Sequence, residues 1–309
     1  MTPFSITFSC TGTKPQPWLA GLRMAFPQAR VEVWQSGAAQ ADYAVVWAPP
    51  QSFFDEQTHL KGIFVIGAGV DALLRLRLPV GVPVVRLDDA GMAVQMAEYV
   101  SQAVIRHFRE LDVYEHGMRD QRWTFRTPRE RSAFAVGIMG LGALGARVAQ
   151  ALAQFEFPVN GWSRSPKTLP GVRSFSGAAQ FDDFLAASRV LVNLLPLTSE
   201  TQGIINQSSL SRLQPGSYVI NVGRGAHLVD DDLLALLGSG HLAGATLDVF
   251  HTEPLPLTHA FSRHPKINVT PHTSARTVLQ DSVAQIASKI AALQRGEAVT
   301  GLVDLGRGY

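Results

Sequence analysis

A glycine-rich segment that follows an apolar run constrains the fold of this chain more than any other feature. The run 135–139 (AVGIM) predicts a buried strand, and it leads through Gly140, Gly142 and Gly145 into a stretch with helical apolar spacing. Gly140 permits a tight turn, Gly142 lets a pyrophosphate approach the backbone, and Gly145 lets the helix pack closely on the sheet. The helix N-terminus adds N–H donors and a positive dipole end. This order predicts a dinucleotide-binding unit whose phosphate loop includes Ala143 and Leu144.

The motif lies well inside the chain, which indicates a further unit before it. A chain of 309 residues exceeds what one hydrophobic core usually organises. Short apolar runs alternate with helical patterns, which predicts an α/β fold of two Rossmann-like or flavodoxin-like doubly wound domains. We expect 1–96 with 277–309 to form a discontinuous substrate (catalytic) domain, and 97–276 to form the dinucleotide-binding domain.

Apolar runs mark the expected strands, which are 5–9, 31–34, 43–48, 63–67 and 82–87 in the first domain and 159–162, 190–195, 218–222, 245–250 and 267–270 after the glycine motif. A helix is expected from Met92, with apolar residues at helical spacing as far as Leu111. The loops 46–50 (VWAPP) and 67–71 (GAGVD) follow strands. They would therefore lie at the carboxyl ends of a sheet, where α/β proteins bind ligands, although turn chemistry alone also explains each loop.

Composition argues against several classes of function. The net charge of +2 is too small to indicate a nucleic-acid or membrane partner, and no apolar run is long enough to span a bilayer. The single cysteine, Cys10, rules out an internal disulfide and is interpreted as a buried inert thiol. His251, His259 and His264 share a loop but lack metal-ligand spacing, so no metal is expected. We expect a reducing, cytoplasmic setting.

Arginines are interleaved with Trp123 and Phe125 in the segment 114–131. Such a mixture could bind nucleic acid, or it could form an extended arm against a neighbouring domain or subunit. The small net charge favours the arm.

Three ionisable side chains follow strands of the second domain. Arg224, Glu253 and His272 would project from the same sheet edge as the phosphate loop. An arginine can grip a substrate carboxylate with two hydrogen bonds, and an imidazole can protonate a forming alkoxide. A neighbouring carboxylate favours the protonated imidazole. Taken alone, Arg224 would be interpreted as a surface cation, Glu253 as a turn residue and His272 as an incidental histidine. Their shared order after the glycines favours hydride transfer to a 2-keto acid.

The end of the second strand after the glycines indicates the cofactor. An acidic residue usually binds the NAD ribose there, but Ser163 stands in its place, followed by Arg164, Ser165 and Lys167. A carboxylate would repel a 2′-phosphate, whereas a guanidinium can bind it. The segment could also be an ordinary solvated turn, but no acid occurs between Glu156 and Gln180 to serve an NAD ribose. We therefore expect NADP(H), with NAD(H) as the weaker cofactor.

Five motifs in this order resemble the D-isomer-specific 2-hydroxyacid dehydrogenases over nearly the whole chain: GLGALG (140–145), LPLT (195–198), NVGRG (221–225), LDVFHTEP (247–254) and PHTS (271–274). Within that family, VWAPP (46–50), GAGVD (67–71), RLDDAGMAVQMAEYV (86–100) and the terminal GLVD and RGY sequences resemble the glyoxylate/hydroxypyruvate reductase A group.

The resemblance implies roles for individual residues. Arg224 would bind and polarise the keto acid, and Glu253 would pair with His272, the acid/base. The backbone N–H groups of Gly69 and Val70 would hold the substrate carboxylate, and Trp47 would line the pocket. The residues implied near the cofactor are Pro196, Val222, Gly223, Arg224, Asp248 and His272. The family also implies two domains that close over a cleft and a homodimer built through 92–131.

The hypothesis is an NADPH-dependent reductase of small 2-keto acids, which converts glyoxylate to glycolate and hydroxypyruvate to D-glycerate. One alternative is a reductase of a bulkier acid such as phenylpyruvate. Another is a non-catalytic dinucleotide-sensing protein, because this fold also serves binding roles.

Overall fold

The computed structural model describes residues 3–309, which form two compact units. Unit 1 contains the residues up to Gly91 together with Thr277–Tyr309, and unit 2 is Met92–Arg276. The chain therefore leaves unit 1 where a helix begins, and not inside that helix at the expected 96/97 boundary.

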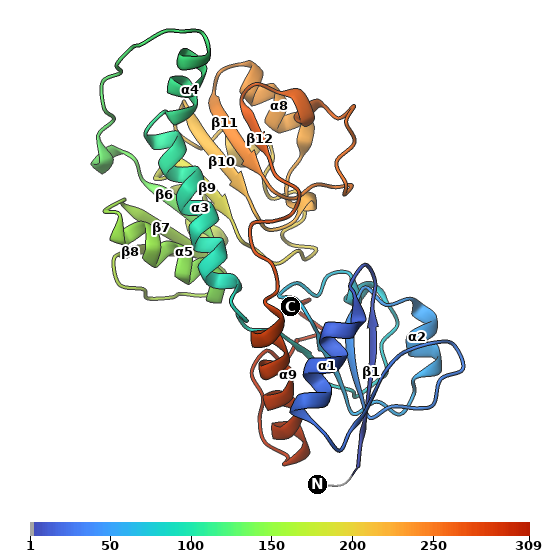
Figure 1. Ribbon diagram of the computed structural model, residues 1–309. Coiled ribbons are helices and arrows are strands. Elements are labelled where there is room, and N and C mark those ends of the chain that lie inside the picture. The colour runs from blue at the N-terminus through green and yellow to red at the C-terminus, as the bar shows by residue number, and fades with distance from the viewer. Residues whose placement is uncertain (1–2) are drawn as a thin grey trace. The chain divides into compact units, whose positions relative to one another are not determined.

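Unit 1 is built on a five-stranded parallel sheet in the order β2-β1-β3-β4-β5. Its elements are β1 (Ser5–Cys10), α1 (Pro15–Ala25), β2 (Arg30–Val33), β3 (Tyr43–Trp47), α2 (Gln51–Glu56), β4 (Gly62–Val65), the 3-10 helix η1 (Leu73–Arg75), β5 (Val84–Arg86) and α9 (Leu279–Gln294). Helices α1 and α9 approach closely at Gly21, where an added Cβ would lie 3.0 Å from Val283 Cγ2. Figure 1 shows these two helices side by side on one face of the sheet, with α2 on the other. The strand order is that of flavodoxin-like domains.

Unit 2 is built on a seven-stranded parallel sheet in the order β12-β11-β10-β9-β6-β7-β8. Its strands are β6 (Val136–Met139), β7 (Val159–Ser163), β8 (Val172–Ser176), β9 (Val190–Asn193), β10 (Ser217–Asn221), β11 (Leu242–Leu247) and β12 (Ile267–Val269). Its helices are α3 (Met92–Phe108), α4 (Leu111–Arg119), η2 (Arg131–Ala133), α5 (Ala143–Gln154), η3 (Ala178–Gln180), α6 (Phe181–Ala186), α7 (Gln207–Leu210), η4 (Gly225–His227), α8 (Asp230–Gly238) and η5 (Ala260–Arg263). The strand order reverses between β6 and β9, as in a Rossmann domain.

Both faces of the unit 2 sheet are buried, which explains why its strands are continuous apolar runs. Val190 and Val192 of β9 join the cluster beneath α3 and α5, whereas Leu191 between them joins the cluster beneath α6 and α8. Figure 1 shows α3 and α5 side by side on one face and α8 on the other. Full burial of each such side chain stabilises the fold by roughly 1.5–3 kcal/mol. The expected α/β fold with two doubly wound domains is confirmed.

Two expectations about elements were wrong or incomplete. The helix from Met92 does not reach Leu111: α3 ends at Phe108, and Glu110 adopts a left-handed φ of 54° before α4 begins. Strand β8 was not expected from the sequence. It is an edge strand in which only Phe175 is buried, so it lacks the apolar run that marks the other strands.

The segment 122–130 has no helix or strand, and side-chain contacts attach it to the end of α3. Glu110 pairs with Arg126 at 2.9 Å and with Arg129 at 3.1 Å. The guanidinium of Arg131 lies 4.8 Å from the ring centroid of Phe108. Contacts therefore fix both the middle and the end of this segment.

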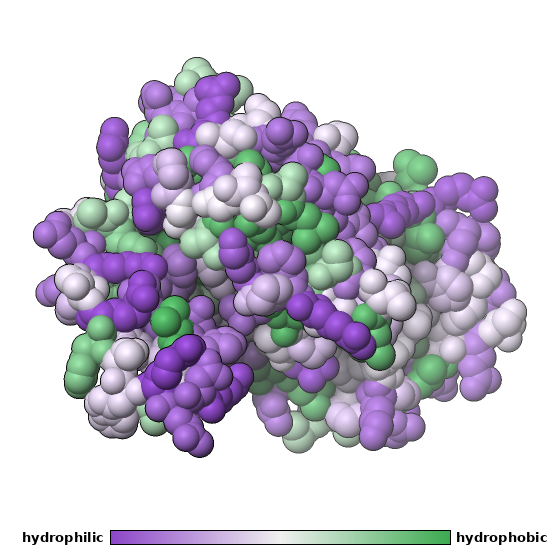
Figure 2. Space-filling view, turned by 90° about the horizontal axis from the view of Figure 1, so that it is seen from above, coloured by the Kyte–Doolittle hydropathy of each residue, from purple (hydrophilic) through white to green (hydrophobic). Residues whose placement is uncertain are grey.

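The molecular face in Figure 2 is mostly hydrophilic, with hydrophobic residues scattered in small groups. Within residues 3–309, no helix combines the length and the apolar character needed to cross a bilayer.

Candidate active site

The three motif glycines stand in three different environments. Gly140 has a φ of 98°, and a Cβ there would lie 2.9 Å from the carbonyl oxygen of Leu194. A Cβ on Gly145 would overlap the carbonyl oxygen of Gly140, so the helix and the turn are in direct contact. Around Gly142, in contrast, an added Cβ would meet no described atom within 4 Å. The open approach is therefore at Gly142, where a phosphate group could reach the backbone.

Gly142 is also the N-cap residue of α5, and it has no side chain with which to cap the helix. Ala143 and Leu144 begin the first turn, whose N–H groups have no acceptor within the helix. Lys167 crosses to the same loop, where its Nζ donates to the carbonyl oxygen of Leu141 at 2.9 Å. The helix end thus has the N–H donors and the adjacent cation that favour an anion.

At the end of β7, Ser163 is buried and its hydroxyl donates to the carbonyl oxygen of Ser165 at 2.8 Å. Arg164 and Ser165 are exposed beside it. The hydroxyl therefore shapes the turn, and Arg164 carries an exposed positive charge beside it.

Two buried amides join the loops that follow β9 and β10. Asn193 Nδ2 donates to Asn221 Oδ1 at 2.9 Å, and both side chains are fully buried. Asn193 Oδ1 accepts from the N–H of Leu195 at 3.2 Å, and Asn221 Oδ1 accepts from the N–H of Gly223 at 3.2 Å. The N–H of Val222 donates to the carbonyl oxygen of Asn193 at 3.3 Å. These bonds hold the Pro196 loop against the Gly223 loop.

Arg224 is half-buried at the start of η4. Its Nη1 donates to the carbonyl oxygen of Gly223 at 2.8 Å, and its carbonyl oxygen accepts from Asn221 Nδ2 at 3.0 Å. Gly225 follows, and a Cβ there would overlap the carbonyl group of Phe250. The arginine loop is thus packed directly on the loop that carries Glu253.

Glu253 and His272 form a hydrogen-bonded pair. Glu253 Oε2 lies 2.7 Å from His272 Nδ1, and Glu253 Oε1 accepts from the N–H of Phe250 at 3.0 Å. Because the carboxylate accepts, Nδ1 carries the hydrogen, and Nε2 is the nitrogen that can exchange a proton with a substrate. The His272 side chain is 44 % exposed, so a substrate can reach it.

His272 has a φ of 52°, a conformation that costs energy for a residue with a side chain. Asp248, which is fully buried, holds this segment in place. Its Oδ1 accepts from Thr270 Oγ1 at 2.6 Å and from the N–H of Thr273 at 2.8 Å, and its Oδ2 accepts from the N–H of Ser274 at 2.8 Å. The backbone carbonyl of Asp248 also accepts from the N–H of His272 at 2.9 Å. The side chain of Asp248 is occupied in shaping the histidine loop, and its cofactor contact stays a prediction.

A tyrosine of α3 supports the same loop. The hydroxyl of Tyr99 is within hydrogen-bond distance of Thr270 Oγ1. Burial raises the pKa of Tyr99 to about 12, so this hydroxyl stays protonated and can donate. The Thr270 hydroxyl in turn donates a hydrogen bond to the carboxylate of Asp248, which only accepts.

The loops after β6, β7, β9, β10, β11 and β12 all lie at the carboxyl edge of one parallel sheet. This edge brings together the phosphate loop, the Ser163 turn, Pro196, Val222 and Gly223, Arg224, and the Glu253–His272 pair. The strand order reverses between β6 and β9, which is where open α/β sheets bind ligands.

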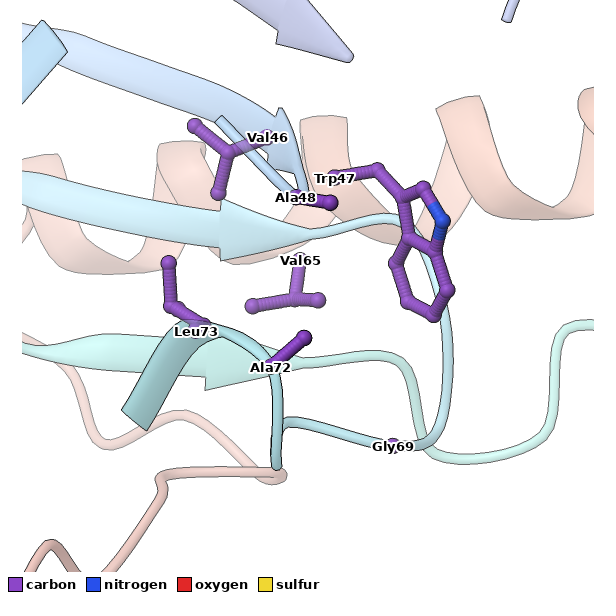
Figure 3. A pocket seen from close by; sticks show the side chains of 7 residues that line it. All are labelled: Val46, Trp47, Ala48, Val65, Gly69, Ala72 and Leu73. Carbon is purple, nitrogen blue, oxygen red and sulfur yellow. The ribbon is translucent and has the colours of Figure 1, made fainter. Parts of the chain in front are cut away.

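Trp47, Gly69 and Val70 belong to unit 1. Trp47 and Gly69 line a small pocket together with Val46, Ala48, Val65, Ala72 and Leu73 (Figure 3). The indole lies against Gly67, where an added Cβ would be 2.9 Å from Trp47 Cη2. Val70 is buried at 3 % exposure, so its side chain is part of the core and only its backbone can serve a ligand.

Sequence reasoning missed several residues that build this site. Asn193, His227, Thr270 and Tyr99 carried no signal, because each has a hydrogen-bond partner that is distant in the chain. Asn221 stands inside the NVGRG motif, but its side chain was given no role.

Two of the three histidines that share a loop lie near one carboxylate. His251 Nε2 is 3.5 Å from Asp230 Oδ1, and His259 Nε2 is 3.3 Å from Asp230 Oδ2. Among residues 3–309, no group of three or more histidine, cysteine or acidic side chains is placed to hold a metal ion.

Comparison with known proteins gives consistent matches. Residues 101–274 match the family described as D-isomer specific 2-hydroxyacid dehydrogenase, NAD binding domain. A glyoxylate/hydroxypyruvate reductase A of Serratia proteamaculans (strain 568) is 50% identical over 301 residues, covering 95% of this chain and 96% of its own length.

Two solved structures are similar along the whole chain. A D-isomer specific 2-hydroxyacid dehydrogenase from Xanthobacter autotrophicus Py2, in complex with NADPH and MES, has a TM-score of 0.95 and 39% identity and covers 99% of both chains. An NADPH-dependent glyoxylate/hydroxypyruvate reductase from Sinorhizobium meliloti, in complex with NADP and sulfate, has a TM-score of 0.93 and 35% identity, and covers 99% of this chain and 100% of its own.

Proposed function

Because this chain belongs to the D-isomer specific 2-hydroxyacid dehydrogenase family, we propose that it reduces small 2-keto acids with NADPH. The substrates would be glyoxylate, which gives glycolate, and hydroxypyruvate, which gives D-glycerate. The observation that carries the proposal is the Glu253–His272 pair, at 2.7 Å, on the same sheet edge as Arg224 and the glycine loop.

Each residue of the site performs one part of the reaction. The Arg224 guanidinium binds the keto acid and polarises its carbonyl group, for which its planar donors are suited. His272 gives the proton on Nε2 to the carbonyl oxygen as negative charge develops there. Glu253 accepts from Nδ1, which orients the ring and stabilises the imidazolium before the transfer.

The residues present fit NADPH. The exposed approach at Gly142 and the N-terminus of α5 suit a pyrophosphate, and Arg164 at the end of β7 suits a 2′-phosphate. When bound, NADPH supplies the hydride that reduces the keto carbon. The solved relatives in complex with NADPH and NADP support this choice.

Unit 2 would be the dinucleotide-binding domain and unit 1 the substrate domain. In unit 1, we propose the backbone N–H groups of Gly69 and Val70 as donors to the substrate carboxylate, and Trp47 as a wall of the substrate pocket. The bulk of Trp47 in that small pocket supports a preference for two- and three-carbon acids.

The chain would act as a homodimer in the cytoplasm. The exposed rings of Trp123 and Phe125, on a segment that Glu110 anchors, support a subunit contact in the arm. A single cysteine in 309 residues suits a reducing compartment.

A panel of 2-keto acids tests the function, with oxidation of NADPH and of NADH followed for each. We expect glyoxylate and hydroxypyruvate with NADPH to give the highest kcat/KM. A clear preference for phenylpyruvate would instead indicate a reductase of bulkier 2-keto acids. Tight NADPH binding with no turnover of any acid would indicate a dinucleotide-sensing protein.

A further inference from the structure

His227 lies between two loops of the active site, although the mechanism above does not use it. It is the last residue of η4, its side chain is fully buried, and it follows Arg224 by three positions. It carries no substrate-facing nitrogen, because both ring nitrogens face the backbone of these loops.

The two nitrogens contact different loops. Nδ1 lies 3.0 Å from the backbone nitrogen of Arg224 and 3.1 Å from its carbonyl oxygen. Nε2 lies 3.2 Å from the carbonyl oxygen of Pro196, in the loop after β9. The ring thus bridges the loop that carries the substrate-binding arginine and the loop expected beside the cofactor.

The chemistry of these partners favours one tautomer. The backbone N–H of Arg224 can only donate, so Nδ1 accepts from it. The carbonyl oxygen of Arg224, which also lies near Nδ1, already accepts from Asn221 Nδ2 and from the N–H of His227. The carbonyl oxygen of Pro196 can only accept, so Nε2 carries the hydrogen. A hydrogen on Nδ1 would crowd the N–H of Arg224, so these contacts favour the neutral ring with its hydrogen on Nε2.

We propose that His227 is a positioning residue: its neutral imidazole, with the hydrogen on Nε2, joins the Arg224 loop to the Pro196 loop and fixes both for catalysis. The proposal rests on the proposed reductase function. The packing leaves little room for adjustment, because a Cβ on Gly223 would lie 3.1 Å from His227 Nδ1 and 2.9 Å from Asn193 Nδ2. The ring and the Asn193–Asn221 pair together hold the two loops at one spacing.

Two conservative variants separate the two bonds. In His227→Asn, the amide oxygen stands near the position of Nδ1 and can accept from Arg224, but the side chain does not reach Pro196. In His227→Gln, the amide nitrogen can reach Pro196, but the acceptor beside Arg224 is lost. His227→Leu removes both bonds and keeps an apolar side chain in the buried position.

We expect the kinetic constants to divide accordingly. His227→Gln should raise KM for glyoxylate and lower kcat/KM by about tenfold to a hundredfold, with KM for NADPH unchanged, because small displacements of a positioning group have effects of this size. His227→Asn should raise KM for NADPH and change KM for glyoxylate much less. His227→Leu should show both defects.

His241→Asn is a matched control. Its Nε2 also contacts a backbone carbonyl, that of Leu210 at 3.1 Å, but the residue precedes β11 at the opposite edge of the sheet. The control should lose thermal stability and keep both KM values. If the His227 variants lowered only Tm, with the kinetic constants of the wild type, or if the Asn and Gln variants shared one defect, the positioning role would be overturned.

The tautomer gives a test that does not depend on turnover. Nitrogen-15 spectra of the histidine rings, with the His227 signals assigned by their loss in His227→Asn, should show Nδ1 without hydrogen and Nε2 with hydrogen at pH 7. An Nδ1–H or fully protonated ring would contradict the proposal. If the wild type reduced no keto acid, the reductase function would fail, while these spectra and a fluorescence titration of the variants with NADPH would still decide the bridge.

Discussion

Glu253 and His272 are both exposed, so their roles depend on the bond between them more than on burial. The bond from Nδ1 to Oε2, at 2.7 Å, leaves Nε2 for the substrate. The buried Asp248 behind them keeps His272 in its left-handed conformation, which a mobile loop would not hold. The pair thus combines an accessible imidazole with a rigid support.

His272→Gln should lower kcat by roughly two to four orders of magnitude, the usual worth of a positioned acid, and change NADPH affinity little. Steady-state kinetics and a fluorescence titration measure the two quantities. His116→Gln, at an exposed histidine of α4, is the control and should behave like the wild type. Near-normal turnover of His272→Gln with saturating glyoxylate would exclude the mechanism.

Glu253→Gln should lower kcat by roughly two to four orders of magnitude, because the carboxylate that accepts from Nδ1 and orients the ring is lost. An amide can also present its NH2 group to Nδ1, which would place the ring hydrogen on the other nitrogen. Steady-state kinetics of both proteins with saturating glyoxylate and NADPH test this, and an unchanged kcat would show that the pair does not position the ring.

The wild type should prefer NADPH over NADH by at least about tenfold in kcat/KM, or roughly 1.4 kcal/mol in the transition state. The combined change Ser163→Asp and Arg164→Ala should reverse the preference, because it adds a ribose acceptor and removes the phosphate partner. Arg173→Ala, which removes an exposed arginine from β8, should leave it unchanged. Equal use of both cofactors by the wild type would contradict the role of Arg164.

At the scale of elements, α3 contains a buried titratable group that the chemistry does not use. His107 stacks on Tyr218 with ring centroids 4.2 Å apart. Burial, followed by the charges of Arg129 and Arg189, lowers the pKa of His107 from 6.5 to about 3. The folded protein therefore keeps this ring neutral at pH values where an unfolded chain would protonate it.

Acid should therefore destabilise the fold through His107. Between pH 6.5 and about 3 the unfolded chain binds a proton that the folded chain does not, so the free energy of unfolding falls by up to about 1.4 kcal/mol per pH unit. His107→Phe keeps an aromatic ring against Tyr218 and removes the titration. Urea unfolding at pH 7, 6 and 5 should show a smaller loss of stability in this variant, and parallel losses in the two proteins would refute the assignment.

The sequence predicted elements well where a local pattern carries the information. Strands such as β6 and β9 are covered on both faces, so their apolar runs are continuous and easily recognised. Edge strand β8 buries one side chain and has no such run. The break at Glu110 was missed because apolar spacing continues across it to Leu111. A left-handed residue of this kind does not change the spacing of the apolar residues around it, so the spacing cannot reveal it.

The same distinction applies to the site. The glycines, Arg224, Glu253 and His272 follow strands in one sheet, so their common edge could be inferred from parallel topology. The contacts of Asn193 with Asn221, and of His227 with Pro196, join residues 28 and 31 positions apart, and no spacing rule reports them. Parallel topology therefore placed Arg224, Glu253 and His272 on one sheet edge, whereas the contacts that hold them there required coordinates.

At the scale of the whole molecule, the exposed aromatic rings of the segment 114–131 predict a homodimer. Trp123 is 77% exposed and Phe125 is 87% exposed on an anchored segment. Trp123→Ser combined with Phe125→Ser should convert a dimer into a monomer in sedimentation velocity experiments. The control changes Met24 and Leu257, which are 81% and 82% exposed elsewhere, to serine and should leave the dimer intact. A wild type that sediments as a monomer would rule out the dimer itself.

The division of the chain also sets an order of events during synthesis. Unit 2 is one continuous stretch, Met92–Arg276, whereas unit 1 needs α9, which packs on α1 at Gly21, and Leu302, which bridges to Val85 of β5. The residues up to Gly91 must therefore wait for Thr277–Tyr309. On the ribosome the sheet of unit 1 remains without one of its helical covers until α9 has been made, while unit 2, which is encoded between the two parts of unit 1, can already close its core.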